Sequence, residues 1–166
     1  MKKRKVMALL VLIALALSLP SCATEDFVPP TSYWCSTFRN LIMRSESGTF
    51  EGDVASLQLS SQNIRTKLEE LETLEEGSKV EEFLLSVLEI ADWLAIKDVE
   101  SFFDLPRMEQ QAFLDAWYIL GNANYAASEE EYIEILNDYA ASWLDIYAGP
   151  MAGKTIPSVT SVSPNE

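Results

Sequence analysis

The catalytic chemistry open to this chain is limited first by the absence of histidine from all 166 residues. A Ser-His-Asp triad, a Cys-His pair, an HExxH zinc site and a Glu-x-x-His di-iron site all require histidine. The two cysteines, Cys22 and Cys35, are too few for a cysteine-ligated metal site within one chain. We therefore expect no metal, no cofactor and none of the common catalytic centres.

Carboxylates remain as candidate catalytic groups, because two of them can act as acid and base in hydrolysis. Glu89 and Asp92 lie three positions apart, which places them on one surface of a helix. They point away from the main apolar stripe of that helix, whereas a general acid needs a buried or closely paired carboxylate. A carboxylate-pair hydrolase is therefore kept only as the weakest hypothesis, and we expect that the chain is not an enzyme.

Aromatic residues form a second set that could serve a function. Aromatic walls with a few hydroxyl groups suit a cavity for a lipid, a sugar or an aromatic ligand. Their helical spacing is equally typical of an ordinary core, so both interpretations stay open. The four candidates for lining such a cavity are Trp117, Tyr132, Tyr139 and Trp143.

Three further apolar residues fall outside the main stripe of their helix and are candidates for a protein interface. Leu85, Trp93 and Ile96 all belong to the apolar segment that follows Ser78. An exposed apolar patch marks an interaction surface, but packing under another helix would explain the same residues. Both explanations are retained.

The N-terminal segment has the composition of an export signal. Lys2, Lys3, Arg4 and Lys5 precede an uncharged and mostly apolar run from Val6 to Leu19. That run has 14 residues, whereas a membrane-spanning helix needs about 20. It is therefore predicted to be the apolar part of a cleaved signal peptide.

Leu19, Pro20, Ser21 and Cys22 resemble the lipobox of bacterial lipoprotein precursors, with Pro20 at a position where that class usually has a small residue. The resemblance implies cleavage before Cys22 and attachment of diacylglycerol to its sulfur. No aspartate follows the cysteine, which in this class implies the outer membrane, or the outer leaflet of the cell membrane where there is one membrane. The alternative is ordinary signal peptidase cleavage after Ala23, which would release a soluble secreted protein.

Removal of the signal makes an acidic chain more acidic. It takes away four of the 12 basic residues and none of the 26 acidic ones, which leaves a net charge of −18. Such a chain is repelled by nucleic acid, so none is expected as a partner. We expect contact with the membrane through the N-terminal lipid and with a neutral or cationic partner, most simply another envelope protein.

The remaining chain shows helical periodicity and no sustained alternation of period two. Ser78 with Glu81, and Ser128 with Glu131, form capping boxes that predict two helix starts. The fold class is predicted to be all-α, an antiparallel bundle of about five helices. Predicted helices include residues 32–46, residues 52–75, one that starts at Pro106 and ends near residue 127, and a last one that ends at Gly149-Pro150. The predicted organisation is a signal peptide (1–21), a tether (22–31), a helical domain (32–148) and a disordered tail (149–166).

Three functional hypotheses follow. The first is a lipid-anchored envelope protein whose acidic helical domain is a non-enzymatic interaction module. The second is a carrier that binds a hydrophobic or aromatic small molecule between its helices. The third is the carboxylate-pair hydrolase.

Overall fold

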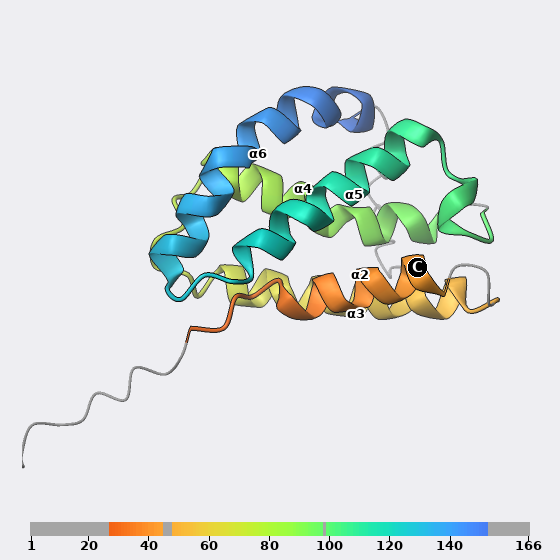
Figure 1. Ribbon diagram of the computed structural model, residues 1–166, viewed down its shortest axis with the longest axis horizontal. Helices are drawn as coiled ribbons and strands as arrows, with labels where there is room; N and C mark the ends of the chain where they lie inside the picture. Colours follow the sequence, from red (N-terminus) through yellow and green to blue (C-terminus); the bar gives the residue numbers. More distant parts are fainter. Residues whose placement is uncertain (1–26, 45–47, 98, 153–166) are drawn as a thin grey trace, which may run out of the picture.

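The computed structural model describes residues 27–44, 48–97 and 99–152, with the backbone alone for residues 148–152. These residues form five α-helices and one short 3-10 helix, and no strand occurs among them, which confirms the predicted all-α fold. Successive α-helices run in opposite directions (Figure 1). In chain order the helices are α2 (Ser32–Met43), α3 (Phe50–Leu68), α4 (Lys79–Ala95), η1 (Phe102–Asp104), α5 (Arg107–Ala123) and α6 (Glu129–Ala152).

The helices pack as two pairs joined through α4. Helices α2 and α3 contact each other along one side, and α5 and α6 contact each other on the opposite side (Figure 1). Helix α4 packs against α3, α5 and α6 and is therefore the central helix, which explains its broad apolar surface. A smaller contact between α2 and α5 also connects the two pairs.

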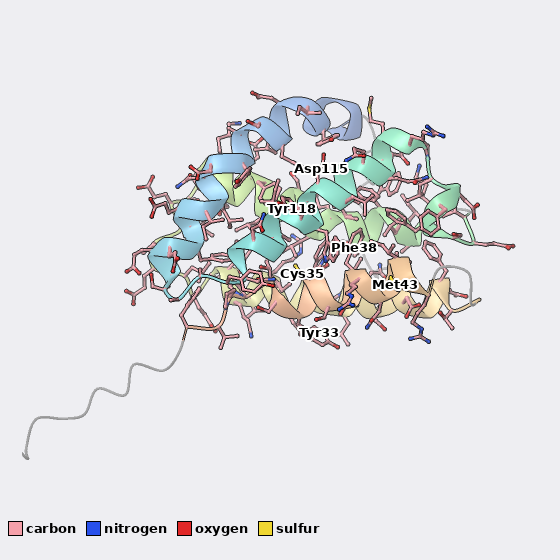
Figure 2. All side chains as sticks on the ribbon, in the orientation of Figure 1. Tyr33, Cys35, Phe38, Met43, Asp115 and Tyr118 are labelled. Carbon is pink, nitrogen blue, oxygen red and sulfur yellow. The ribbon has the colours of Figure 1, made fainter. Side chains whose placement is uncertain are left out.

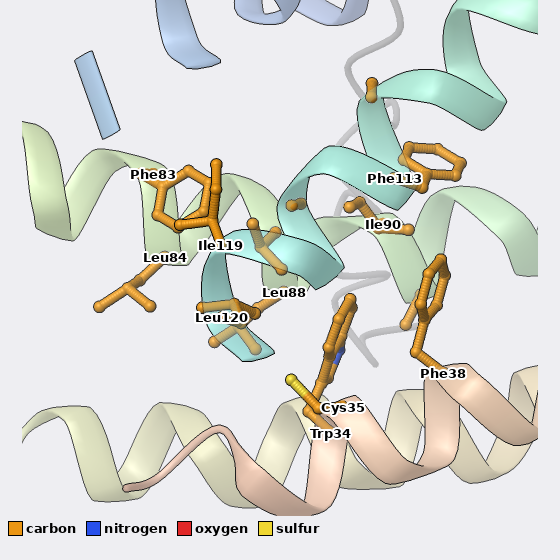
Figure 3. Packing of buried hydrophobic residues seen from close by; sticks show 14 of the residues in the cluster. Trp34, Cys35, Phe38, Phe83, Leu84, Leu88, Ile90, Phe113, Ile119 and Leu120 are labelled. Atoms are coloured by element: carbon orange, nitrogen blue, oxygen red, sulfur yellow. The ribbon is translucent and has the colours of Figure 1, made fainter. Parts of the chain in front are cut away.

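Aromatic side chains join α2 to the rest of the core. The Trp34 and Phe38 rings stack with their centroids 5.0 Å apart, and the Phe102 ring meets Phe38 edge-on at 5.9 Å. The Trp34 indole N–H donates a hydrogen bond to the Ser61 hydroxyl at 3.1 Å, which satisfies its buried polar atom. Figure 3 shows Trp34 and Phe38 extending from α2 toward side chains of α4 and α5. Each fully buried aromatic or large aliphatic side chain contributes about 1.5–3 kcal/mol through the hydrophobic effect.

Both predicted capping boxes are present. The Glu81 and Glu131 backbone N–H groups donate to the hydroxyls of Ser78 and Ser128, each at 3.2 Å. Each glutamate carboxylate in turn accepts a hydrogen bond from the N–H of the residue before the serine, at 2.5 and 2.7 Å. These bonds satisfy amides that have no partner within the helix, so they fix where α4 and α6 begin.

The second helix is shorter than predicted, because α3 ends at Leu68 rather than near residue 75. The following loop is held by α6, since the Thr73 N–H and hydroxyl both donate to the Glu129 carboxylate, at 2.6 and 2.8 Å. Leu71 and Leu74 pack against the core from this loop. Their spacing continued the helical pattern, but a contact with a distant part of the chain determines the actual structure.

Other helix ends also differ from the prediction. Helix α2 ends at Met43 instead of residue 46, and α5 runs from Arg107 to Ala123, with Pro106 just before its first turn. Helix α6 continues to Ala152, so the prediction that Gly149-Pro150 ends it was wrong. A proline so close to a helix end removes only one of the last backbone hydrogen bonds. The signal peptide, Cys22 and residues 153–166 of the predicted tail lie outside the described residues.

The described part of the predicted tether, residues 27–31, packs on the domain. Pro29, Pro30 and Thr31 are buried, and the Phe27 ring lies 5.9 Å from the Tyr132 ring. The Thr31 hydroxyl donates to Asn124 Oδ1 at 2.9 Å and lies 3.0 Å from the Tyr132 hydroxyl. This segment therefore belongs to the folded domain. The sequence did not reveal this, because a Pro-Pro sequence fits an extended chain whether the chain is free or packed.

Within the part of the chain that the structure describes, none of the helices combines the length and the apolar character that crossing a membrane would require.

Candidate functional site

An open groove of about 420 Å³ lies between α2 and the second half of α5. Figure 2 looks onto this face, with Cys35 on α2 and Tyr118 on the part of α5 that lies across from it. We call it the α2–α5 groove. Its lining includes Ser36, Arg39, Trp117, Tyr118, Gly121, Asn122 and Tyr125.

The floor of the groove contains a hydrogen bond between its two helices and a protonated thiol. The Trp117 indole N–H donates to the Cys35 carbonyl at 3.1 Å and so ties α5 to α2. Burial raises the pKa of the Cys35 thiol to about 12, with a hydrogen bond to Asn124 acting in the opposite direction. The thiol therefore stays protonated at neutral pH, and a thiol is a poor nucleophile compared with a thiolate.

The rim of the groove exposes aromatic rings. Tyr118 is 66% exposed and Tyr125 is 89% exposed, whereas Trp117 is half-buried beside them. No hydrogen bond of the Tyr118 or Tyr125 hydroxyl occurs within the described chain. Exposed aromatic rings next to a concave surface provide contact area at a low cost in side-chain entropy.

The groove is free of acidic residues, although the chain is strongly acidic. None of its lining residues is Asp or Glu. Among the five α-helices described, α2 alone contains no acidic residue, and α5 contains none after Asp115. Arg39 is exposed and forms no ion pair or hydrogen bond of its guanidinium with any part of the described chain. The groove is thus a locally basic site on an acidic protein.

Gly121 is a residue of the α5 wall, and because it has no side chain it leaves space in the groove. A Cβ atom added at this position would meet no atom within 4 Å, so packing does not require glycine here. Glycine in a helix costs about 1 kcal/mol relative to alanine. Without a side chain at this position, a ligand in the groove could approach the α5 backbone closely.

The four predicted ligand-binding residues do not line one cavity. Trp117 lies in the α2–α5 groove, but the other three are not part of it. Tyr132 and Trp143 are core residues, since the Tyr132 hydroxyl pairs with Thr31 and the Trp143 indole donates to the Ala112 carbonyl at 3.0 Å. Burial also raises the pKa of Tyr132. Their polar atoms are satisfied by the protein and therefore do not need a ligand.

Tyr139 lies on the outside of α6 and is 44% exposed. It is therefore separated from the buried stripe that contains Tyr132 and Trp143. Helical spacing placed these residues near one another, but a wide stripe includes both buried positions and positions at its edge.

The three predicted interface residues do not share one environment, because one of them is buried and two are exposed. Trp93 is only 7% exposed, and its ring packs edge-on against Phe113 of α5 at 5.3 Å. The Lys97 ammonium lies 4.0 Å from the centre of the same ring. Trp93 is therefore a core residue, covered by α5, and not part of an exposed interface. Leu85 and Ile96 are exposed.

The candidate carboxylate pair shows no catalytic environment. Glu89 is exposed, and Asp92 accepts a hydrogen bond at 3.1 Å from the Gln58 side chain of α3. Neither residue lines the α2–α5 groove. Among the residues that the structure describes, no three Cys, Asp or Glu side chains are grouped closely enough to hold a metal ion.

Sequence reasoning missed most of the groove residues, namely Arg39, Tyr118, Gly121, Asn122 and Tyr125. A signal was present, because residues 27–45 and 116–128 contain no acidic residue in a chain that has 26 of them. All the residues that line the groove come from these two stretches. Their proximity in space could not be read from the sequence, since α2 and α5 are far apart along the chain.

Comparison of the chain with protein-family models, with curated proteins and with solved structures finds no match.

Proposed function

We propose that this chain is an exported bacterial lipoprotein whose helical domain is a non-enzymatic binding module of the cell envelope, and that it binds an envelope component in the α2–α5 groove. One observation supports this most strongly. The groove gathers exposed aromatic rings and a cation that the described fold does not use for its own hydrogen bonds or ion pairs. Exposed aromatic and arginine side chains that the fold does not use are typical of a recognition surface.

The expected lipid anchor supports a location close to the membrane. Phe27 is packed on the domain, and it lies five residues after Cys22. Five extended residues span at most about 18 Å. Thr31 also bonds to Asn124, which precedes Tyr125 at one end of the groove. The groove would therefore open near the membrane surface, within reach of envelope material.

The two alternative functions gain no support from the geometry. A carrier cavity at Trp117, Tyr132, Tyr139 and Trp143 would need these side chains to converge, and only Trp117 lines the groove. A hydrolase would need a buried or closely paired acid, whereas Glu89 is exposed and Asp92 is bonded to Gln58. The binding module is therefore preferred over both.

Tyrosine modification tests the binding site. The purified domain is nitrated with tetranitromethane, alone and with an envelope fraction from the bacterium that makes it, and each tyrosine is quantified by peptide mass spectrometry. We expect Tyr118 and Tyr125 to be protected by the fraction, while Tyr139, exposed on α6, reacts equally in both samples. Equal protection of Tyr139, or no protection of Tyr118 and Tyr125, would contradict the proposal.

Intact-mass measurement tests the lipid anchor. The full-length chain is expressed in a bacterium and purified from membranes in mild detergent, together with the Cys22→Ser variant. We expect a mass that begins at Cys22 and carries acyl chains, and a variant without acyl chains that leaves the membrane fraction. An unmodified chain cleaved after Ala23 would instead establish the secreted alternative.

A further inference from the structure

We propose that the ligand of the α2–α5 groove is a saccharide that carries a carboxylate, with its ring against Tyr118 and its carboxylate on Arg39. This inference rests on the proposed function and names the class of ligand for that site. The inference is drawn from four kinds of group that lie together in the groove: a guanidinium without a partner in the described chain, exposed aromatic rings, side-chain amides and a glycine with free space beside it. None of the residues that line the groove is acidic.

The charge of the groove favours an anionic group on the ligand. Arg39 has no acidic neighbour among the lining residues and no partner elsewhere in the described chain. A guanidinium presents a planar pair of donors that matches a carboxylate in a bidentate geometry. At physiological ionic strength charges are screened beyond about 8 Å. A bound anion would therefore interact chiefly with the charges nearest to it, and Arg39 is the charged residue that lines the groove.

The aromatic residues and Gly121 favour a ring-shaped ligand. The C–H groups on one face of a pyranose ring pack on an aromatic ring, and Tyr118 and Tyr125 offer exposed rings for this contact. Gly121 leaves space at the wall between them, so a ring can approach the backbone of α5. A volume of about 420 Å³ falls within the usual range for small-molecule sites, about 300–1,000 Å³.

The polar residues favour a sugar over a peptide. Both walls are helices, whose backbone groups already bond within the helix and offer no edge for an extended peptide. Recognition must therefore come from side chains, and the side chains of Ser36 and Asn122 make no hydrogen bond within the described chain. Amide and hydroxyl groups match the adjacent hydroxyls of a sugar. An amphipathic helix would instead lay an apolar face into the groove. That would leave the Arg39 guanidinium and the Asn122 amide without partners.

Titration calorimetry with defined probes tests the proposal. The mature domain is titrated with glucuronic acid, galacturonic acid and N-acetylmuramic acid, and with glucose, galactose and N-acetylglucosamine as their respective neutral counterparts. A short poly-glutamate peptide tests the acidic-peptide alternative. We expect at least one carboxylated sugar to bind at least tenfold more tightly than its neutral counterpart, and poly-glutamate to show no binding.

Variants distinguish groove binding from a nonspecific effect of charge. Arg39→Gln should weaken the binding of the carboxylated sugar at least tenfold, and Tyr118→Ala should weaken the same binding severalfold. Arg107→Gln removes an exposed cation at the far end of α5, and Tyr139→Ala removes an exposed tyrosine from α6, so both should bind like the parent. Unfolding curves of all four variants establish that each is folded.

Each outcome decides the inference. It is wrong if no carboxylated sugar binds better than its neutral counterpart, if Arg39→Gln binds equally well, or if poly-glutamate binds in place of the sugars. Protection of Tyr118 and Tyr125 by the envelope fraction, with no binding of any sugar, would leave the proposed function standing and reject the saccharide alone.

Discussion

The α2–α5 groove and the acidic end of the bundle use their polar side chains in opposite ways. At the acidic end, formed by the loop between α3 and α4 together with the start of α6, carboxylates bond to the backbone. Glu129 accepts two hydrogen bonds from Thr73, and Glu81 and Glu131 complete capping boxes. In the groove, the side chains of Arg39 and Asn122 form no such bond within the described residues.

This difference separates residues that hold the fold from residues that are available to a ligand. Removing a carboxylate that satisfies buried or capping amides costs stability, because the amide loses its partner. Removing an exposed side chain with no partner costs almost nothing. Mutations at the acidic end should therefore change stability without changing binding, and truncation of the exposed Arg39 and Tyr118 side chains in the groove should change binding without changing stability.

The largest effect is expected from the core that both regions share. Trp34→Ala removes a fully buried ring that stacks on Phe38, and should lower the free energy of unfolding by about 3–5 kcal/mol. Denaturant unfolding measures it. Tyr33→Ala, which changes the exposed neighbouring residue, should stay within about 0.5 kcal/mol of the parent. A loss below about 1 kcal/mol for Trp34→Ala would mean that α2 is not packed as described.

Alkaline pH should destabilise the protein through two buried groups, Cys35 in the floor of the groove and Tyr147 of α6. Burial raises the pKa of Cys35 from 9.0 to about 12, and burial together with the Asp115 carboxylate raises the pKa of Tyr147 from 10.0 to about 12. Both groups ionise at lower pH in the unfolded chain, so stability should be full below pH 9 and fall as pH rises to about 12.

The urea midpoint measured from pH 7 to 12 tests this expectation. Cys35→Ala removes one of the two groups and should make the decline shallower. A midpoint that stays constant up to pH 12 would contradict the buried environment of both groups.

A smaller effect is expected at the acidic end. Glu129→Ala removes both hydrogen bonds to Thr73 and should destabilise the domain by about 2 kcal/mol, as measured by denaturant unfolding. Glu134→Ala, at an exposed position of the same helix, should change stability by less than about 0.5 kcal/mol. Neither variant should alter the binding of a carboxylated sugar. Weaker binding by folded Glu129→Ala would show that the two regions are not independent.

The smallest effect on stability has the opposite sign. Gly121→Ala should stabilise the domain by about 0.5–1 kcal/mol, because its new methyl group meets no atom and the helix gains a better helix former. The same methyl group narrows the groove, so binding should weaken. Thermal unfolding measures the change in stability, and titration calorimetry of the same sample measures the change in binding. Stabilisation with unchanged binding would remove Gly121 from the proposed site.

The fold was largely predictable, because helical periodicity and the two Ser-x-x-Glu boxes are local signals. The end of α3 was not, since Leu71 and Leu74 continue the helical pattern while Thr73 is held by Glu129. The groove was not predictable either. It depends on α2 and α5 lying together, and sequence spacing selected Tyr132 and Trp143, whose polar atoms turn out to bond within the core.

The most direct test of the claim that the groove is the binding site uses the indole N–H signals of the four tryptophans. A ¹⁵N-labelled sample of the mature domain is titrated with solubilised envelope material, and the signals are assigned with single Trp→Phe variants. Trp117 lines the groove, whereas Trp34, Trp93 and Trp143 are buried in the core. We predict that the Trp117 signal shifts while the other three stay in place. A shift of Trp93 or Trp143 with Trp117 unchanged would contradict the claim.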